Sequence, residues 1–135
     1  MNIDINCDLS EMSLADGPGN DKAIMPFISS VNIACGFHAG DPLTIEQTLR
    51  SAIRNGVSIG AHPGYPDREN FGRKPMTMSP REMRAMLLYQ AGAVKAMAET
   101  ARTRVSPRYG REIKSFSGKR QWKWHSISLL IMTGR

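Results

Sequence analysis

The chain has 135 residues and a formal net charge of +6, from 18 lysines and arginines against 12 aspartates and glutamates. Hydrophobic residues make up 41% of the chain and charged residues 22%, which is typical of a globular protein and excludes an intrinsically disordered one. The length suits one domain and is short for two. No apolar run approaches the roughly 18 residues that a membrane helix needs, so we expect no membrane span.

The positive charge is confined to the last quarter of the chain. Residues 1–100 carry nine basic and 11 acidic side chains, whereas residues 101–135 carry nine basic and one acidic side chain. Trp122 and Trp124, the only two tryptophans, also lie in the last segment. We therefore predict a domain over residues 1–101 and a basic tail of different character over residues 102–135.

Cysteine content and the N-terminus indicate the cellular compartment. Cys7 and Cys35 are the only two cysteines, too few for a disulfide framework and too far apart for a CxxC metal motif. The N-terminus has early acidic residues and lacks the basic segment and apolar run of a secretory signal. We predict a cytoplasmic, reducing location.

The first elements follow from the hydropathy pattern. Residues 2–7 alternate between apolar and polar, which predicts a strand that ends just before Asp8. Residues 9–20 are rich in turn-forming types and predict a loop, with a short helix possible over residues 21–28. Residues 30–35 predict a second strand.

A helix and a third strand follow without long connections. Asp41 is placed as a helix N-cap, Pro42 as the first helical residue and Gly56 as the C-terminal stop. The predicted strand over residues 57–61 begins directly after that glycine. Strand, helix and strand with such short joints predict a parallel sheet with a right-handed crossover. The apolar helix face comprises Ile45, Leu49, Ala52 and Ile53.

The next segment is irregular and leads into a long helix. Residues 62–78 contain several prolines and glycines, and loops of this length are usually functional. A capping box over residues 79–82, with Pro80 at the first helical position, begins a helix of about 20 residues. A fourth parallel strand is then expected. Residues 101–120 do not supply it, and the apolar run over residues 127–132 comes late.

Three side chains with metal-binding or catalytic chemistry follow the three predicted strands. Asp8, His38 and His62 should meet, because catalytic groups of parallel α/β folds gather at the carboxyl ends of strands. One carboxylate and two imidazoles suit a divalent transition metal, which could activate water or polarise a carbonyl. We predict these three as catalytic residues and candidate metal ligands. Asp41 is also a catalytic candidate beside its capping role.

Further polar side chains and glycines are placed on the same rim as candidate substrate-binding residues. Each has an ordinary alternative explanation, since aspartates cap turns, histidines are often partly buried, and glycines serve turn geometry. No GxxxxGK[ST] or GxGxxG motif is present, so no local motif indicates a phosphate loop. These candidates are Asn6, Glu11, Asn32, Gly36, Gly64, Asp67 and Arg73.

Two long sequence blocks are specific enough to identify relatives: NIACGFHAGDP at residues 32–42 and IGAHPGYPD at residues 59–67. Shorter blocks are NCDL at 6–9, IMP at 24–26, SS at 29–30, FGR at 71–73 and YQ at 89–90. Over residues 1 to about 100 these blocks closely resemble the LamB/YcsF family. The resemblance adds Tyr65, in the second long block, to the candidate substrate-binding residues.

The resemblance implies a fold and an activity. The fold is α/β, a partial (β/α) barrel of the glycoside hydrolase/deacetylase type, with parallel strands and crossover helices. The activity is ATP-dependent hydrolysis of 5-oxoproline (pyroglutamate) to glutamate, with partner subunits B and C of a 5-oxoprolinase. A lactam amide is unstrained and stable, so phosphorylation of its oxygen would create a leaving group while polar rim residues position water.

The chain also departs from the family pattern. Ser10 and Glu11 stand where the family usually has Gly-Glu, and the family's later KPHGALY motif is absent. Family members are also much longer. We hypothesise that the chain is truncated by a change of reading frame near residue 101. A partial barrel leaves a sheet edge unpaired, which predicts marginal stability or self-association. The truncated chain could also be inactive, so its activity has to be tested.

Two alternative functions belong to other classes. One is a metal-dependent sugar or amide deacetylase-like hydrolase, from the same carboxylate and imidazoles. The other is a non-enzymatic nucleic-acid binder, in which the tail tryptophans would stack on bases. We do not favour the second, since any basic tail binds nucleic acid weakly. The basic residues that would contact nucleic acid in this alternative are Arg102, Arg104, Arg108, Arg111, Lys114, Lys119, Arg120 and Lys123.

Overall fold

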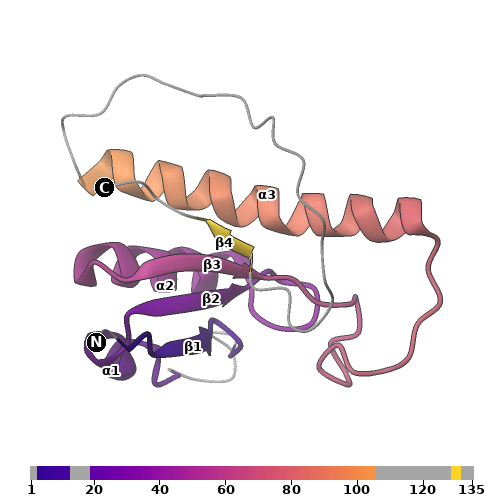
Figure 1. Cartoon of the computed structure of the whole chain (residues 1–135), viewed down its shortest axis with the longest axis horizontal. Helices are drawn as coiled ribbons and strands as arrows, with labels where there is room; N and C mark the ends of the chain where they lie inside the picture. The colour runs from indigo at the N-terminus through magenta and orange to yellow at the C-terminus, as the bar shows by residue number, and fades with distance from the viewer. Residues whose placement is uncertain (1–2, 13–18, 106–128, 132–135) are drawn as a thin grey trace.

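The computed structural model describes the backbone of residues 3–12, 19–105 and 129–131, and the side chains of residues 3–12 and 19–102. Most of the predicted basic tail, including both tryptophans, therefore lies outside the described residues. In chain order (Figure 1) the elements are β1 (Asn6–Leu9), α1 (Asp21–Ile24), the 3-10 helix η2 (Met25–Phe27), β2 (Ser30–Ala34), α2 (Pro42–Asn55), β3 (Ser58–His62), α3 (Pro80–Val105) and β4 (Leu129–Ile131).

The four strands form one sheet in the order β1-β2-β3-β4. The first three are parallel, which confirms the predicted α/β fold with crossover helices. The register places Asp8 beside Asn32 and Asn32 beside Gly60, so the polar residues of adjacent strands lie in rows across the sheet. The strand ends after which the functional residues were expected therefore lie at the same edge of the sheet.

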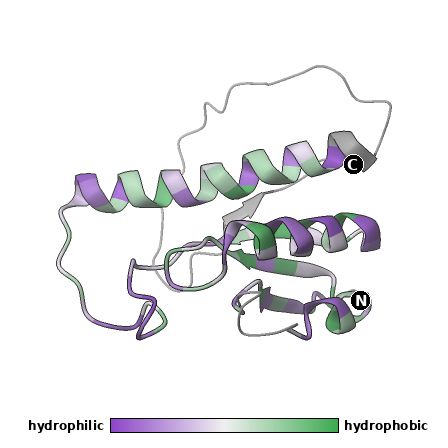
Figure 2. Ribbon diagram, turned by 180° about the vertical axis from the view of Figure 1, so that it is seen from behind, coloured by the Kyte–Doolittle hydropathy of each residue, from purple (hydrophilic) through white to green (hydrophobic). Residues whose placement is uncertain are grey.

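The sheet has one apolar face and one polar face. Alternate residues of the strands, such as Ile33 and Ile59, are fully buried in the core. Helices α2 and α3 contact these strands and each other, and Figure 2 shows α2 lying over the sheet. The intervening residues Asn6, Asp8 and Asn32 point to the opposite face, because successive strand side chains alternate. Helix packing thus leaves the polar face available for a site.

The first strand differs from the prediction. Apolar and polar residues alternate over 2–7, but the strand runs from Asn6 to Leu9 and Asp8 lies within it. Ile3 is 78% exposed and Ile5 54% exposed, so the alternation does not reflect burial of one face. The backbone N–H of Ile5 instead donates to Ser29 Oγ at 2.8 Å. The Ile5 carbonyl oxygen accepts from the backbone N–H groups of Ser29 and Ser30, so contacts between the two segments begin one residue before the strand.

Helix α2 begins and ends where the sequence predicts. The Asp41 side chain accepts hydrogen bonds from the backbone N–H groups of Leu43 and Thr44, and Pro42 is the first helical residue. Gly56 has φ +68°, and its N–H donates to the carbonyl oxygens of the last turn. The buried face includes Ile45, Leu49 and Ala52 as predicted.

Helix α3 starts at the predicted capping box and is longer than expected, with 26 residues. The backbone N–H of Ser79 donates to Glu82 Oε2 at 2.8 Å. The helix buries Gln90, Val94, Ala98 and Ala101, at spacings of three and four. No helix in the described part of the chain is both long and apolar enough to cross a membrane.

The short helix expected over residues 21–28 is present as the four-residue α1 followed by η2, with Pro26 in the 3-10 turn. One other prediction needs correction. The fourth strand is antiparallel, not parallel: Leu129–Ile131 pairs with Ile59–Ala61 of β3. Three residues of β3 are thus paired by β4. The predicted marginal stability or self-association stays a prediction.

Candidate functional site

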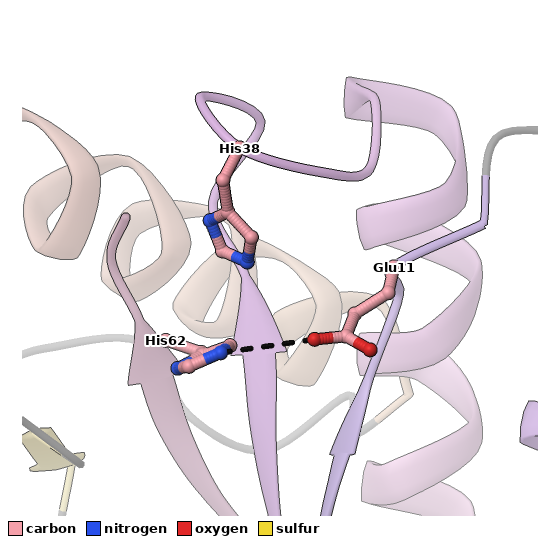
Figure 3. A group of neighbouring side chains, drawn as sticks. All are labelled: Glu11, His38 and His62. Atoms are coloured by element: carbon pink, nitrogen blue, oxygen red, sulfur yellow. Dashed lines mark ion pairs between the residues drawn. The ribbon is translucent and has the colours of Figure 1, made fainter. Parts of the chain in front are cut away.

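Two imidazoles and a carboxylate meet at the carboxyl ends of the parallel strands (Figure 3). Glu11 lies two residues after β1, His38 lies between β2 and α2, and His62 is the last residue of β3. Candidate ligand atoms of these three residues all lie within 4.8 Å of one another. His62 Nε2 is 3.7 Å from Glu11 Oε1. The three strands therefore bring together the side chains of residues far apart in the sequence.

Asp8 lies beside this group, on the polar face of the sheet. Its Oδ2 is 3.8 Å from His62 Nε2, and its Oδ1 accepts a hydrogen bond from Asn32 Nδ2 at 2.8 Å. Asn32 Nδ2 is also 2.8 Å from Asn6 Oδ1. Asn6, Asp8 and Asn32, all predicted site residues, are thus brought together. The set of three ligand atoms includes Glu11, however, where the sequence analysis placed Asp8.

His38 is buried in a tight aromatic environment, with 3% of its surface exposed. Its ring meets the rings of His62 and Phe71 edge-on, at centroid distances of 4.9 and 5.4 Å. Burial, together with the nearby His62 imidazole, lowers the pKa of His38 to about 4. A neutral imidazole at neutral pH can use a ring nitrogen as a lone-pair donor or hydrogen-bond acceptor.

Gly64 allows the β3 loop to lie against His38. A Cβ atom on Gly64 would be 2.1 Å from His38 Nδ1, so only glycine fits. The Gly64 backbone is held by fully buried Gln90 on α3: its N–H donates to Gln90 Oε1 and its carbonyl accepts from Gln90 Nε2, both at 3.0 Å. From the sequence, Gln90 was named only as part of the YQ block at residues 89–90. The signal that could have found it is a polar residue within an apolar stripe.

We expect replacement of Gln90 by leucine to destabilise the fold, because it leaves the N–H and carbonyl of Gly64 without these partners. Each unsatisfied buried group costs about 1–3 kcal/mol, so we expect a loss of about 2–4 kcal/mol in the free energy of unfolding. Urea denaturation followed by circular dichroism would measure it. Gln47→Leu on α2 is the matched control, because Gln47 is exposed and should tolerate the change. Equal effects of both variants would contradict the assigned role of Gln90.

Arg68 holds the loop that carries His38, although it was not among the site residues predicted from the sequence. Its Nη2 donates to the carbonyl oxygen of Gly36 at 3.0 Å and to that of Gly40. Gly36 has φ +89°, a conformation that favours glycine, and no atom in the described part of the chain lies within 4 Å of where its Cβ would be. This contact joins positions 32 apart in the sequence, which no local pattern reveals.

The other predicted binding residues belong to the loop after β3. Asp67 is buried and accepts hydrogen bonds from Asn70 Nδ2 at 2.7 Å and from the backbone N–H of Lys74 at 3.0 Å. The Asn70 bond is the main cause that lowers the pKa of Asp67. Arg73 is exposed and lies over the ring of Phe71, 5.6 Å from its centroid. Tyr65 is half-buried. Asp67 thus organises the loop, and roles in substrate binding stay predictions.

Acid-base groups of the site differ in their environments. Burial raises the pKa of the Glu11 carboxyl, against a smaller lowering by His62. Burial also raises the pKa of the Cys35 thiol to about 12, so this thiol stays protonated and is a poor nucleophile. Cys7 has a raised pKa as well, mainly through desolvation. The acid-base chemistry of the site is therefore assigned to carboxylates and imidazoles.

Asp41 serves the helix that follows His38. One oxygen accepts from the backbone N–H groups of Leu43 and Thr44 at 2.9 and 3.0 Å, and the other accepts from Thr44 Oγ1 at 2.7 Å. These bonds confirm the predicted N-cap. The catalytic role of Asp41 stays a prediction.

We expect Asp41→Ala to lower the free energy of unfolding by about 1–2 kcal/mol, the usual cost of losing an N-cap side chain. Asp41→Asn should keep most of the stability, because asparagine caps nearly as well as aspartate. Thermal and urea unfolding of both variants would measure the difference. If Asp41→Asn kept native stability but lost the hydrolytic activity that the family resemblance implies, the result would instead support catalysis by Asp41.

Comparisons with known proteins agree with this fold. The LamB/YcsF family model matches residues 3–107. A Bacillus cereus protein, named as the A subunit of 5-oxoprolinase, is 52% identical over 99 residues, covering 73% of this chain and 39% of that protein. An Azoarcus protein of the same name is 49% identical over 106 residues, covering 78% and 41%. A crystal structure titled lactam utilization protein, from Thermus thermophilus, has a TM-score of 0.70 and 46% identity, covering 74% and 40%. The chain thus spans about two fifths of the length of these relatives.

Proposed function

The chain belongs to the LamB/YcsF family, and we propose that it carries part of the ring-opening site of a 5-oxoprolinase, a hydrolase that acts on a cyclic amide. The observation that supports this most is the position of His62 Nε2 between two carboxylates, 3.8 Å from Asp8 Oδ2 and 3.7 Å from Glu11 Oε1. Relatives whose names are those of a 5-oxoprolinase component and a lactam utilization protein share this part of the chain. The substrate is then 5-oxoproline.

Asp8 is the proposed general base. Because Asn32 holds one of its oxygens at 2.8 Å, the other is directed toward His62 and can accept a proton from the attacking water. Neutral His38 and half-buried His62 face the same space and can orient the lactam carbonyl and the water. Hydrolysis breaks the ring C–N bond, adds hydroxyl to the carbonyl carbon and delivers a proton to the leaving nitrogen.

ATP and partner subunits B and C are part of the proposal for the complete enzyme. The described residues do not provide a fitting nucleotide site: the sequence lacks a phosphate-loop motif, and Asp41 occupies the first free amides of α2. We therefore propose that ATP binds elsewhere in the complete assembly. This chain supplies lactam binding and the acid-base groups.

The test is formation of glutamate from 5-oxoproline by the chain mixed with subunits B and C, with and without ATP. We expect ATP-dependent glutamate formation that falls by at least about 100-fold in Asp8→Asn, the usual range for loss of a general base. Glu99→Gln, at an exposed site on α3, should retain the activity of the unmodified chain. No glutamate from the unmodified mixture would contradict the proposal for this chain.

A metal-dependent deacetylase-like hydrolase is the second candidate, favoured by the grouped ligand atoms of Glu11, His38 and His62. It differs from the first in needing neither ATP nor partner subunits. Release of acetate from an acetylated amino sugar by the chain alone, abolished by a chelator, would support it over 5-oxoproline hydrolysis. The nucleic-acid alternative concerns the basic tail, most of which lies outside the described residues, and it stays a prediction.

A further inference from the structure

We propose that Glu11, His38 and His62 form a binding site for one divalent transition-metal ion of the zinc or cobalt type, with Asp8 next to the ion but not a ligand. The proposed metal site does not depend on the proposed ring-opening activity. It rests on the position of three donor groups and on the burial of one of them.

His38 is the strongest evidence for a ligand. It is 97% buried, and among the residues that the structure describes neither of its ring nitrogens has a hydrogen-bond partner. Buried polar atoms normally have partners, so this imidazole requires an explanation. In Figure 3 its ring points toward His62 and Glu11. A metal ion between these groups would give a His38 ring nitrogen the partner that it lacks.

Packing identifies which His38 nitrogen would bind. The backbone of Gly64 lies against Nδ1, since a Cβ there would be 2.1 Å away. No ion fits on that side, which leaves Nε2 as the ligand atom. Phe71 packs edge-on against the same ring at 5.4 Å, and Gln90 fixes Gly64 through two hydrogen bonds of 3.0 Å. The ring is therefore held in one orientation before an ion binds, which favours affinity.

The donor separations suit a small ion. Metal-ligand distances of about 2.0–2.1 Å separate tetrahedral donors by about 3.4 Å. His62 Nε2 and Glu11 Oε1 are 3.7 Å apart, close to that value, and all three groups lie within 4.8 Å. Glu11 is partly exposed on a loop and has the rotamer freedom to close the remaining gap. Two imidazoles with one carboxylate leave coordination positions open for water or a substrate carbonyl.

Asp8 has a different place in this site. One of its oxygens is bound by Asn32 at 2.8 Å, and the other approaches His62 Nε2 at 3.8 Å. From its place after the first strand, Asp8 was the predicted carboxylate ligand. Asp8 lies within β1, whereas Glu11 follows it on a loop that brings the longer side chain over the strand ends. Asp8 is thus placed to accept a hydrogen bond from water on the ion.

The test is direct titration of the purified, chelator-treated chain with Zn²⁺ by calorimetry and with Co²⁺ by visible absorption, whose intensity reports coordination geometry. We expect one ion per chain with micromolar or tighter affinity. Glu11→Gln and His62→Ala should weaken binding by more than about 100-fold, beyond the 10- to 100-fold usual for outer-shell changes. His62 is half-exposed, so its variant should fold even if His38→Ala does not.

Asp8→Asn is the matched comparison, because it removes a neighbouring carboxylate that lies outside the three-ligand set. It should weaken binding by no more than about 10- to 100-fold and keep the Co²⁺ spectrum. The proposal is overturned if the unmodified chain binds neither ion, or if Asp8→Asn abolishes binding while Glu11→Gln does not. Because binding is measured without substrate, failure here leaves the ring-opening test unaffected.

Discussion

Replacement of Gly40 by alanine should strongly destabilise the chain, with an expected loss of about 3–5 kcal/mol in the free energy of unfolding. Gly40 has φ +78°, and an added Cβ would lie 2.3 Å from the backbone carbonyl oxygen of Ser10. The positive φ alone costs an alanine about 1–2 kcal/mol. The clash adds to that cost, because a backbone atom cannot rotate away as a side chain would. Domains are stable by only about 5–15 kcal/mol.

Two other glycines separate these contributions. Gly56 has a similar φ of +68° but open space around its Cβ position, so Gly56→Ala should cost only about 1–2 kcal/mol. Gly92 lies on α3 with neither constraint, and Gly92→Ala should stabilise by up to about 1 kcal/mol. Urea unfolding of the three variants measures the change in the free energy of unfolding for each. A Gly40→Ala cost no larger than that of Gly56→Ala would contradict the close contact with Ser10.

The contact between Gly40 and Ser10 matters for the site as well as for stability. Ser10 directly precedes Glu11, and its backbone N–H donates to Asp21 Oδ2 at 2.9 Å. Gly40 lies two residues after His38 and directly before the N-cap of α2. Their close approach therefore fixes the loop after β1 relative to the loop after β2. Backbone packing at this point sets the distance between the Glu11 and His38 side chains.

The sequence predicts those elements whose ends depend on interactions between residues close together in the chain. Asp41 caps α2 and Gly56 ends it, because side-chain capping and a left-handed φ involve residues within a few positions. The parallel pairing of β2 with β3 follows from short connections and the handedness of crossovers. The approach of His38 to His62, at 4.9 Å between ring centroids, follows in turn from that pairing.

Contacts between distant residues account for what the sequence could not predict. Gln90 reaches Gly64 across 26 positions, and a helix pattern cannot distinguish this from an ordinary buried glutamine. Glu11 joins the imidazoles because its loop turns over the strand ends, where Ser10 has φ +64°. The antiparallel β4 pairs over three residues only, too few for periodicity to indicate a direction. Each of these features depends on packing that forms after the local elements are in place.

The second large effect is expected for Gly64→Ala, which should displace the His38 ring and remove the function of the site. Gly64 lies outside the left-handed region, so an alanine is compatible with its backbone. Its Cβ, however, would be 2.1 Å from Nδ1 and 2.5 Å from Cγ of His38. We expect a loss of about 1–3 kcal/mol in stability, similar to other overpacked sites, and a large fall in glutamate formation and metal binding.

A double-mutant cycle with His38→Ala tests the cause. Removing the ring should relieve most of the cost of Gly64→Ala, giving a coupling energy of at least about 1 kcal/mol in urea unfolding. Gly72→Ala is the contrasting case, because its Cβ would meet His38 Cβ at 2.9 Å and its φ is +70°. Alanine at position 38 keeps that Cβ, so His38→Ala should not rescue Gly72→Ala. Rescue of both glycine variants, or of neither, would show that the imidazole does not occupy the space beside Gly64.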